Sequence, residues 1–339
     1  MQPFLSVCIM TYNRAETLRE ALDSILPQVA DEPEVEVLVS DNASVDETRE
    51  VVAGYCGRYP RLRYSRNPEN VGFDGNVVAC IENAAGEYVA YFSDDDLAPP
   101  GMIAGLLAGL KEHRPAAAYI NHSAFFQDNP AARGEPTQPV LKRLFTNATE
   151  YFLYTGLGFI SALTVKRSEA LKHASSTVKD RGTAHVDIAA RVVLASAGPY
   201  WFDGTIGVIA RHDEASGYDP LRFGAMNTTQ VHLDLLKEGL LSQADVDWHN
   251  RKTIRLFLPR HIVNNRVNRR KFVSAGELRQ MYGRDPLFYL VPYPLALIPA
   301  PILRFLALPA RGIMRAWRKW RLGSGRSVPS TRHLAPPSR

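Results

Sequence analysis

Three consecutive carboxylates follow directly on a strand-like run. Residues 88–93 read Tyr-Val-Ala-Tyr-Phe-Ser, and Asp94, Asp95 and Asp96 come immediately after them. Adjacent carboxylates at a strand end repel one another, and the usual relief is a divalent cation with oxygen ligands. A solvated acidic turn closed by Pro99 and Pro100 is the alternative. The rest of the first hundred residues favours the cation site.

Strand-like and helix-like segments alternate ahead of this run. Residues 4–10 and 35–40 are short apolar runs, and residues 62–65 read as a third short strand. Each precedes a segment that reads as a helix, with apolar residues at helical spacing in 18–26. This alternation predicts right-handed crossovers and an α/β fold with a mainly parallel sheet flanked by helices. Ligands bind beyond the carboxyl ends of the strands in such sheets. We therefore expect residues 11–14, Asp41 and the three aspartates to converge on one crevice.

Four motifs in a fixed order carry a resemblance to a known family. They are Ser6-Val-x-Ile-x-Thr-Tyr-Asn-Arg14, Val39-Ser-Asp-Asn-Ala-Ser-x-Asp46, Asn70-x-Gly72 with Asn76, and Ala85-Gly-Glu-Tyr-Val-Ala-Tyr-Phe-Ser-Asp-Asp-Asp96. Together they resemble the family 2 glycosyltransferases of the GT-A fold, which is Rossmann-like. Within that family the chain is similar to the enzymes that build bacterial surface polysaccharides, including the abequosyltransferase-like group.

This resemblance implies a nucleotide-sugar site. Asp41 can accept a hydrogen bond from the base edge, and the resemblance implies that the base is a pyrimidine, usually uracil. Arg14 supplies a cation for a phosphate. Thr11 and Asn13 could instead cap the following helix, and both roles can coexist. The residues expected to bind the donor are Thr11, Tyr12, Asn13, Arg14, Asp41, Asn70, Gly72, Asn76, Asp94 and Asp95.

The family's acidic motif aligns with Ser93-Asp94-Asp95 and implies a divalent metal, Mg²⁺ or Mn²⁺. Asp95 is then the best metal ligand, and Asp94 contacts the ribose or a metal-bound water. Asp96 and His212 complete the expected metal-binding set, the histidine by position alone, with a loop histidine in solvent as the alternative. Many family members have an aspartate where this chain has Ser93, which leaves open which carboxylate touches the ion.

The second half of the chain is expected to supply the acceptor side. Residues 156–167 resemble the family's middle strand, and residues 200–210 read as a strand pair. Asp187 starts a helix and occupies the place where inverting members keep their general base. A first-turn carboxylate that complements the helix dipole is the alternative reading. His185, two residues away, could tune or replace Asp187.

Charge is divided sharply along the chain. Residues 1–247 hold 21 Lys and Arg against 33 Asp and Glu, whereas residues 248–339 hold 19 against 2. This asymmetry predicts contact with an anionic surface. The apolar run 287–308 is interrupted by prolines and followed by arginines interleaved with Trp317 and Trp320, which favours a bilayer interface. A buried hairpin packed on the catalytic domain is the alternative.

The predicted organisation follows these shifts in composition. Cys8, Cys56 and Cys80 are widely spaced, which predicts reduced core cysteines of a cytosolic protein, and we expect no secretory signal. The expected parts are a catalytic domain over 1–222 (nucleotide-sugar half 1–100, acceptor half 101–222), a basic helical region over 223–285, an apolar and basic membrane-interface segment over 286–322, and a disordered tail over 323–339.

The sequence therefore predicts a metal-dependent inverting glycosyltransferase, peripheral on the cytoplasmic face of the cell membrane. Its expected partners are a nucleotide-sugar donor, a lipid-linked saccharide acceptor of O-antigen or capsule type, and the anionic membrane surface; the oligomeric state is left open. One alternative is a nucleotidyltransferase, although residues 6–14 are not the Gly-rich phosphate loop that such an enzyme would carry. Another is a non-catalytic polysaccharide-assembly protein. No nucleic acid is expected, because the basic helices lack an aromatic stacking platform.

Overall fold

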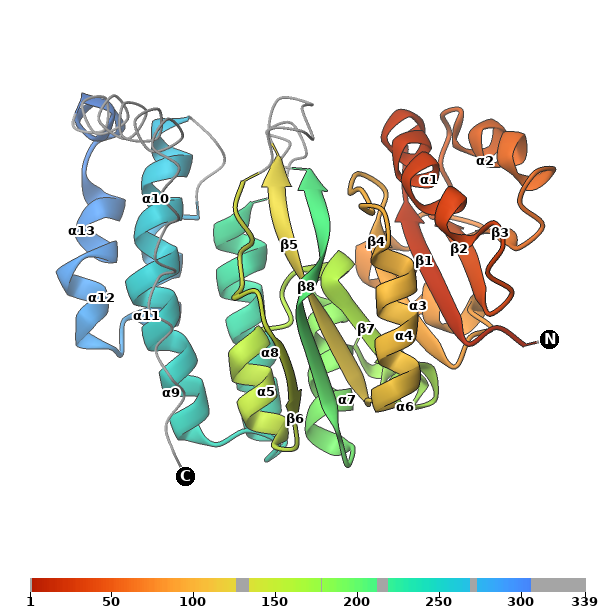
Figure 1. Cartoon of the computed structure of the whole chain (residues 1–339). Helices are drawn as coiled ribbons and strands as arrows, with labels where there is room; N and C mark the ends of the chain where they lie inside the picture. The colour runs from red at the N-terminus through yellow and green to blue at the C-terminus, as the bar shows by residue number, and fades with distance from the viewer. Residues whose placement is uncertain (1, 126–133, 178, 212–218, 269–272, 306–339) are drawn as a thin grey trace, which may run out of the picture. The chain divides into compact units, whose positions relative to one another are not determined.

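The computed structural model describes residues 2–125, 134–177, 179–211, 219–268 and 273–305. The chain divides into two compact units, residues 1–216 and 217–339, and each is described by itself. The first unit is built on a mixed sheet and the second is helical (Figure 1).

The sheet in the described part of the first unit has eight strands in the order β3-β2-β1-β4-β7-β5-β8-β6. Six strands run in one direction, and only β6 and β7 run against their neighbours. The predicted α/β fold with a mainly parallel sheet is confirmed. The strands are β1 (Leu5–Thr11), β2 (Val35–Asp41), β3 (Leu62–Arg66), β4 (Tyr88–Ser93), β5 (Ala117–Phe125), β6 (Lys142–Phe145), β7 (Leu163–Lys166) and β8 (Tyr200–Arg211).

The helices of this unit pack on the sheet through apolar stripes. In α1 the buried side chains include Leu18, Leu22 and Ile25, which recur at helical spacing. Each fully buried side chain of this kind stabilises the fold by about 1.5–3 kcal/mol. The helices are α1 (Ala15–Val29), α2 (Thr48–Cys56), α3 (Gly72–Asn83), α4 (Met102–His113), α5 (Ala148–Thr155), α6 (Arg167–Leu171) and α7 (Ala184–Ala195), with short turns η2 (Ile160–Ala162) and η3 (Ala174–Ser176).

Strand register brings the predicted site loops to one edge of the sheet. Thr11 lies opposite Asp41 in the β1 and β2 pair, and Met10 lies opposite Ser93 in the β1 and β4 pair. The loops after these three strands therefore leave the sheet side by side. Helix α7 packs against α3, and its first residue, Ala184, donates its N–H to Asp74 in the first turn of α3.

Three local predictions are wrong. Residues 156–167 do not form one strand, because Gly156 and Leu157 have positive φ angles of 67° and 49°, and the segment turns before β7. Residues 200–210 form a single strand rather than a pair. A side chain at Gly204 would meet the carbonyl of Pro139, so this glycine serves a close backbone approach and no turn. Cys56 is exposed at the end of α2 rather than in the core.

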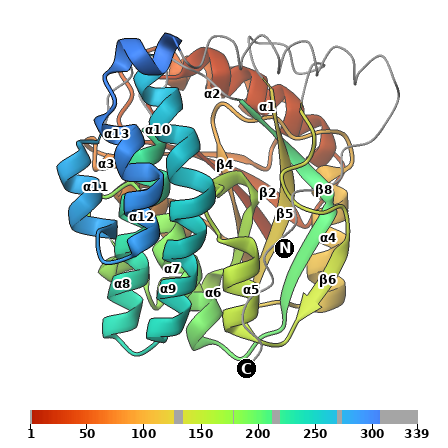
Figure 2. The ribbon, with the colours of Figure 1, turned by 90° about the vertical axis from the view of Figure 1, so that its left-hand side faces the viewer.

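The second unit is a group of helices around an apolar core. Leu221, Ile254, Leu258, Leu278 and Phe288 are buried in this core. Helices α10 and α13 lie side by side (Figure 2). The elements are the π-helical segments η4 (Pro220–Asn227) and η5 (Thr253–Phe257) and helices α8 (Thr228–Lys237), α9 (Gln243–Lys252), α10 (Leu258–Val267), α11 (Ala275–Tyr282), α12 (Pro286–Leu290) and α13 (Pro292–Leu297).

The start of the predicted membrane-interface segment has two faces. Phe288 and Ala296 are buried in the core of the second unit, whereas Leu290 is 71% exposed and Phe305 is 75% exposed. Part of the segment is therefore core, and part presents apolar side chains outward. None of the helices in the described ranges has the length and apolar character needed to cross a membrane. Residues 306–322 and the predicted disordered tail 323–339 lie outside the described residues.

Candidate active site

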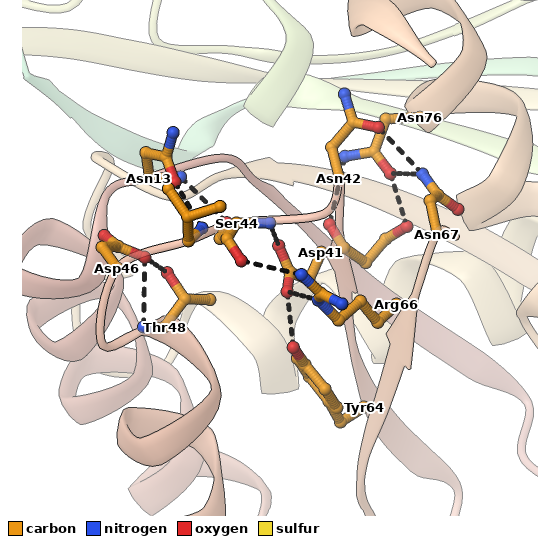
Figure 3. A network of polar contacts seen from close by, with 12 residues as sticks. Asn13, Asp41, Asn42, Ser44, Asp46, Thr48, Tyr64, Arg66, Asn67 and Asn76 are labelled. Carbon is orange, nitrogen blue, oxygen red and sulfur yellow. Dashed lines mark hydrogen bonds and ion pairs between the residues drawn. The ribbon is translucent and has the colours of Figure 1, made fainter. Parts of the chain in front are cut away.

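Asp41 ends β2 as a buried, fully bonded carboxylate. One oxygen accepts the Ser44 N–H at 2.9 Å, and the other accepts the Tyr64 hydroxyl at 2.5 Å and Arg66 Nε at 3.3 Å (Figure 3). Burial and the hydrogen bond to Asp41 raise the pKa of Tyr64, so this phenol stays protonated and donates. Two side chains of β3, Tyr64 and Arg66, thereby fix the carboxylate of Asp41, which is 1% exposed.

The loop after β1 is fixed by the loop after β2. Asn13 has a φ of 53°, its N–H donates to Ser44 Oγ at 2.9 Å, and its Oδ1 accepts the Val45 N–H at 2.8 Å. The first N–H of α1, from Ala15, donates to Asp46 at 3.0 Å, and this contact replaces the predicted capping by Thr11 or Asn13. Thr11 is buried beneath the loop. Tyr12 is 43% exposed and leaves an aromatic ring accessible.

Four asparagines close the loop between β3 and α3. Asn42 Nδ2 donates to Asn70 Oδ1 at 2.8 Å and to the Gly72 carbonyl at 3.1 Å. Asn67 Nδ2 donates to the side-chain oxygens of Asn42 and Asn76, at 3.0 and 3.1 Å (Figure 3). The predicted donor-binding residues Asn70, Gly72 and Asn76 therefore shape the loop. Asn67, which the sequence analysis did not assign a role, joins them; its signal is its place in an asparagine-rich loop at a strand end.

The acidic run contains a carboxylate pair that shares one cation. Arg14 Nη1 lies 3.2 Å from Asp94 Oδ1 and 2.8 Å from Asp95 Oδ2. Ser93, the departure from the family pattern, donates its hydroxyl to Asp95 Oδ1 at 2.5 Å. Burial raises the pKa of Asp94 to about 7 although the Arg14 charge opposes the shift. The folded protein thus places carboxylates at this edge of the sheet although burial disfavours the charged form of Asp94.

Asp96 has a different environment from its two neighbours. Its Oδ2 accepts the Ser161 hydroxyl at 2.5 Å, and its Oδ1 accepts the Arg211 N–H at 3.0 Å. Burial, with the nearby charge of Asp95, raises the pKa of Asp96 to about 8. Asp96 therefore ties the end of β4 to η2 and to β8.

The residues present fit a divalent cation only in part. Asp94 and Asp95 converge on one guanidinium nitrogen, so the same two carboxylates could converge on a metal ion. Among the residues that the structure describes, no group of three His, Cys, Asp or Glu side chains is placed to hold a metal. His212, the predicted further ligand, lies outside the described residues.

The start of α7 is held by Asp74, a residue that the sequence analysis missed. Asp74 is buried in the first turn of α3 and accepts the backbone N–H groups of Arg181 at 2.9 Å, Gly182 at 3.2 Å and Ala184 at 2.9 Å. Its local signal is weak, because an aspartate in the first turn of a helix is common for electrostatic reasons alone. The contact joins the starts of α3 and α7.

Asp187 and His185 lie in the first turn of α7 but have separate surroundings. Asp187, 2% exposed, pairs with Arg191 Nε at 2.8 Å and Lys179 Nζ at 3.4 Å. His185, 7% exposed, has Nε2 at 3.5 Å from the Gly158 carbonyl and packs against the edge of Phe73. Burial lowers the pKa of His185 to about 4, so its ring is neutral at neutral pH.

Comparison with known proteins gives a family for this arrangement. Residues 6–172 match the model of glycosyl transferase family 2. The chain is 41% identical over 93 residues to an abequosyltransferase of Salmonella typhimurium. This match covers 27% of the chain and 28% of that protein. It is 34% identical over 111 residues to a Campylobacter jejuni GalNAc(5)-diNAcBac-PP-undecaprenol beta-1,3-glucosyltransferase, covering 32% and 35%. The matched segments thus span about a third of these relatives.

A solved structure extends the likeness beyond the matched motifs. Residues 1–349 of TarS from S. aureus, in complex with UDP-GlcNAc, superpose with a TM-score of 0.57 at 19% identity, and the alignment covers 93% of this chain and 92% of that one. At this identity the likeness concerns the fold. Residues 6–172 are therefore a domain of glycosyl transferase family 2, and the unit that contains them has the GT-A fold.

Proposed function

We propose that the protein is an inverting, metal-dependent glycosyltransferase that moves a sugar from a nucleotide-sugar donor to a hydroxyl group of a lipid-linked saccharide. The observation that carries this proposal is the ion pairing of Arg14 with Asp94 and Asp95. It lies at the edge of the sheet where β2 ends in Asp41. A nucleotide sugar needs a cation for its diphosphate and a polar edge for its base, and this edge offers both chemistries.

In the proposed complex the base and ribose bind over the loops after β1 and β2. Asp41 is the acceptor for an N–H of a pyrimidine, with Tyr64 and Arg66 holding its carboxylate in place. Tyr12 offers an exposed ring beside this loop. The Asn42 and Asn67 network supports the loop after β3, which carries the further predicted donor-binding residues Asn70, Gly72 and Asn76.

Asp94 and Asp95 would hold the Mg²⁺ or Mn²⁺ ion, with Asp96 and His212 as the further predicted ligands. The ion, when bound, offsets the negative charge of the diphosphate. Arg14 contributes positive charge at the same place, and its contact with both carboxylates keeps them close together before donor binding. Asp96 supports the site by holding β4 against Ser161 and the Arg211 backbone.

A single displacement inverts the anomeric centre and requires a base for the acceptor hydroxyl. The first turn of α7 supplies the two candidates. Asp187 is the residue at the position that the family resemblance implies, and His185 is the second. The Asp74 contacts hold this turn at the ligand edge of the sheet.

The second unit and the named relatives support the proposed acceptor and location. One relative's name specifies a polyprenol-linked acceptor, and another is an abequosyltransferase. Residues 248–339 carry 19 basic residues against 2 acidic ones, and Leu290, Ile302 and Phe305 are exposed apolar side chains in this region. Basic and apolar groups together favour the anionic cytoplasmic surface of a membrane, where a lipid-linked surface-polysaccharide precursor would be met.

The test is donor binding followed by release of nucleoside diphosphate. UDP-GlcNAc and a panel of other UDP-, CDP- and GDP-sugars are screened by thermal shift with and without Mn²⁺. A pyrimidine nucleotide sugar should raise the melting temperature in the presence of Mn²⁺, and adding a polyprenol-diphosphate saccharide should release free nucleoside diphosphate. Binding of nucleoside triphosphates with release of diphosphate from them would favour a nucleotidyltransferase instead. An absence of any nucleotide binding would favour a non-catalytic assembly protein.

A further inference from the structure

We infer that Arg14 occupies the cation position between Asp94 and Asp95 until the donor binds, and that a divalent ion takes this position when the donor diphosphate draws the guanidinium away. This inference rests on the proposed function and concerns the way in which the ion and the nucleotide sugar enter the same site. Arg14 is then a positioning residue that couples the binding of the two ligands.

The point on which the two carboxylates converge is occupied by a protein cation. Asp95 Oδ1 accepts the Ser93 hydroxyl at 2.5 Å, and Asp95 Oδ2 lies 2.8 Å from Arg14 Nη1. The same nitrogen lies 3.2 Å from Asp94 Oδ1. A divalent ion held by both carboxylates would compete with Arg14 for the lone pairs of these two oxygens.

The third carboxylate of the acidic run is bonded to other parts of the sheet. Asp96 Oδ2 accepts the Ser161 hydroxyl, and Asp96 Oδ1 accepts the Arg211 N–H. Asp96 is 3% exposed, so a loss of either bond would leave a buried polar group without its partner. Release of these bonds would also detach β4 from η2 and β8. An incoming ion therefore meets less resistance at the Arg14 contact than at Asp96.

Arg14 can leave the carboxylates without a movement of its loop. The backbone on either side is fixed, because the Asn13 N–H donates to Ser44 and the Ala15 N–H donates to Asp46. The Arg14 side chain is 36% exposed, compared with 5% for Asp94 and 16% for Asp95. A guanidinium pairs with phosphate as well as with carboxylate, so a diphosphate that arrives beside it offers an equivalent partner.

The charges of the groups make the exchange depend on both ligands. Arg14 and a divalent ion repel each other, so they cannot both lie against the same two oxygens without a large penalty. A donor diphosphate removes this conflict, because it attracts the displaced guanidinium and the ion alike. Ion and nucleotide should therefore favour each other's binding, and linkage requires that each raises the affinity for the other by the same factor.

The experiment measures the affinity of the full-length protein for Mn²⁺ by electron paramagnetic resonance of the free ion. It is done without nucleotide and with UDP or CDP, whichever binds the wild type, after correction for Mn²⁺ bound by free nucleotide. The variants are Arg14→Met and, as a second neutral replacement that keeps a hydrogen-bond donor, Arg14→Gln. The control is Arg66→Met, because the Arg66 side chain is 42% exposed and pairs with Asp41 instead of the acidic run.

We expect both Arg14 variants to bind Mn²⁺ alone about tenfold or more tightly than the wild type does, a factor typical of coupling between two sites. In the presence of Mn²⁺ they should bind the nucleoside diphosphate about tenfold more weakly, because the phosphate contact is lost. Arg66→Met should bind Mn²⁺ alone with wild-type affinity. Circular dichroism melting curves establish that each variant is folded.

The outcomes separate this inference from the proposed function. Arg14 variants that bind Mn²⁺ alone no more tightly than the wild type overturn the inference, because Arg14 then does not compete with the ion. An equal gain in Arg66→Met also overturns it, because the gain then reflects net charge and not the position of Arg14. A wild-type protein that binds neither UDP, CDP nor GDP, with or without Mn²⁺, overturns the proposed function itself.

Discussion

The two units bury ionisable side chains in different ways. In the first unit the buried carboxylates Asp41, Asp74 and Asp96 lie at strand or helix ends, and each accepts hydrogen bonds from at least two groups. In the second unit, His232 and His249 are buried against each other with ring centroids 3.8 Å apart, and both have lowered pKa values because of burial. Burial of a carboxylate is costly unless it is bonded. The first unit accepts that cost for several carboxylates at strand and helix ends, whereas the second unit packs two histidines, kept neutral by burial, against each other.

The largest expected effect comes from removing Asp95, the least buried member of the acidic run. Asp95→Ala should abolish transfer and metal-dependent donor binding while leaving the fold intact, because the change removes coordination and also relieves repulsion with Asp94 and Asp96. Donor affinity is measured with Mn²⁺ and with chelator. Asp46→Asn, which removes a carboxylate outside the acidic run, is the control and should retain metal-dependent binding. Equal donor affinity with and without chelator in wild type and variant would contradict the prediction.

Asp41 tests whether a fully bonded carboxylate is chiefly structural. Asp41→Asn weakens the contacts with Tyr64 and Arg66, and hydrogen bonds to charged groups contribute about 1.5–3 kcal/mol each, so we expect the free energy of unfolding to fall by roughly 2–3 kcal/mol. Denaturant titration measures this loss. Tyr64→Phe removes one of the same bonds and should cost less. If Asp41→Asn weakens donor binding without a change in stability, the carboxylate serves the ligand alone.

Much of the candidate site could be predicted because it depends on local patterns. The apolar runs that end in Thr11, Asp41 and Ser93 predict strands, and parallel strands bring their carboxyl ends to one edge. The contacts that organise the edge could not be predicted. Asp74 bonds residues more than 100 positions away, and Ser161 bonds Asp96 across 65 positions. Sequence spacing reveals no such pairing.

The first turn of α7 shows the same limit at smaller scale. The spacing of His185 and Asp187 predicts that they face different ways, but it does not predict their partners. Those partners include Lys179 and Gly158, which lie in loops whose course is set by tertiary packing. Likewise, the composition of residues 286–305 indicates an apolar surface, and only packing separates buried Phe288 from exposed Leu290.

Acid should affect the second unit through its buried histidines. Burial lowers the pKa of His232 to about 3, from an ordinary value near 6.5. Between these two values His232 is protonated in the unfolded chain and neutral in the folded unit. The stability contribution is complete above about pH 6.5 and is lost as the pH falls toward 3. We expect the melting temperature to drop over this range, and His232→Phe to make the drop smaller. An unchanged pH profile in the variant would show that other groups control acid unfolding.

The smallest expected effect tests whether the apolar face of the second unit meets a membrane. Leu290→Glu combined with Phe305→Glu alters two exposed side chains and should leave the core around Phe288 intact. Vesicle flotation with anionic lipids should decrease, and raising the salt concentration should weaken wild-type binding further, because each basic residue near such a surface contributes on the order of 1 kcal/mol. Leu144→Glu, a change at an exposed leucine of the first unit, is the matched control and should float as the wild type does. Equal flotation of all three proteins would mean that the exposed face of residues 286–305 does not bind lipid, and the contrast between the units would then concern folding alone.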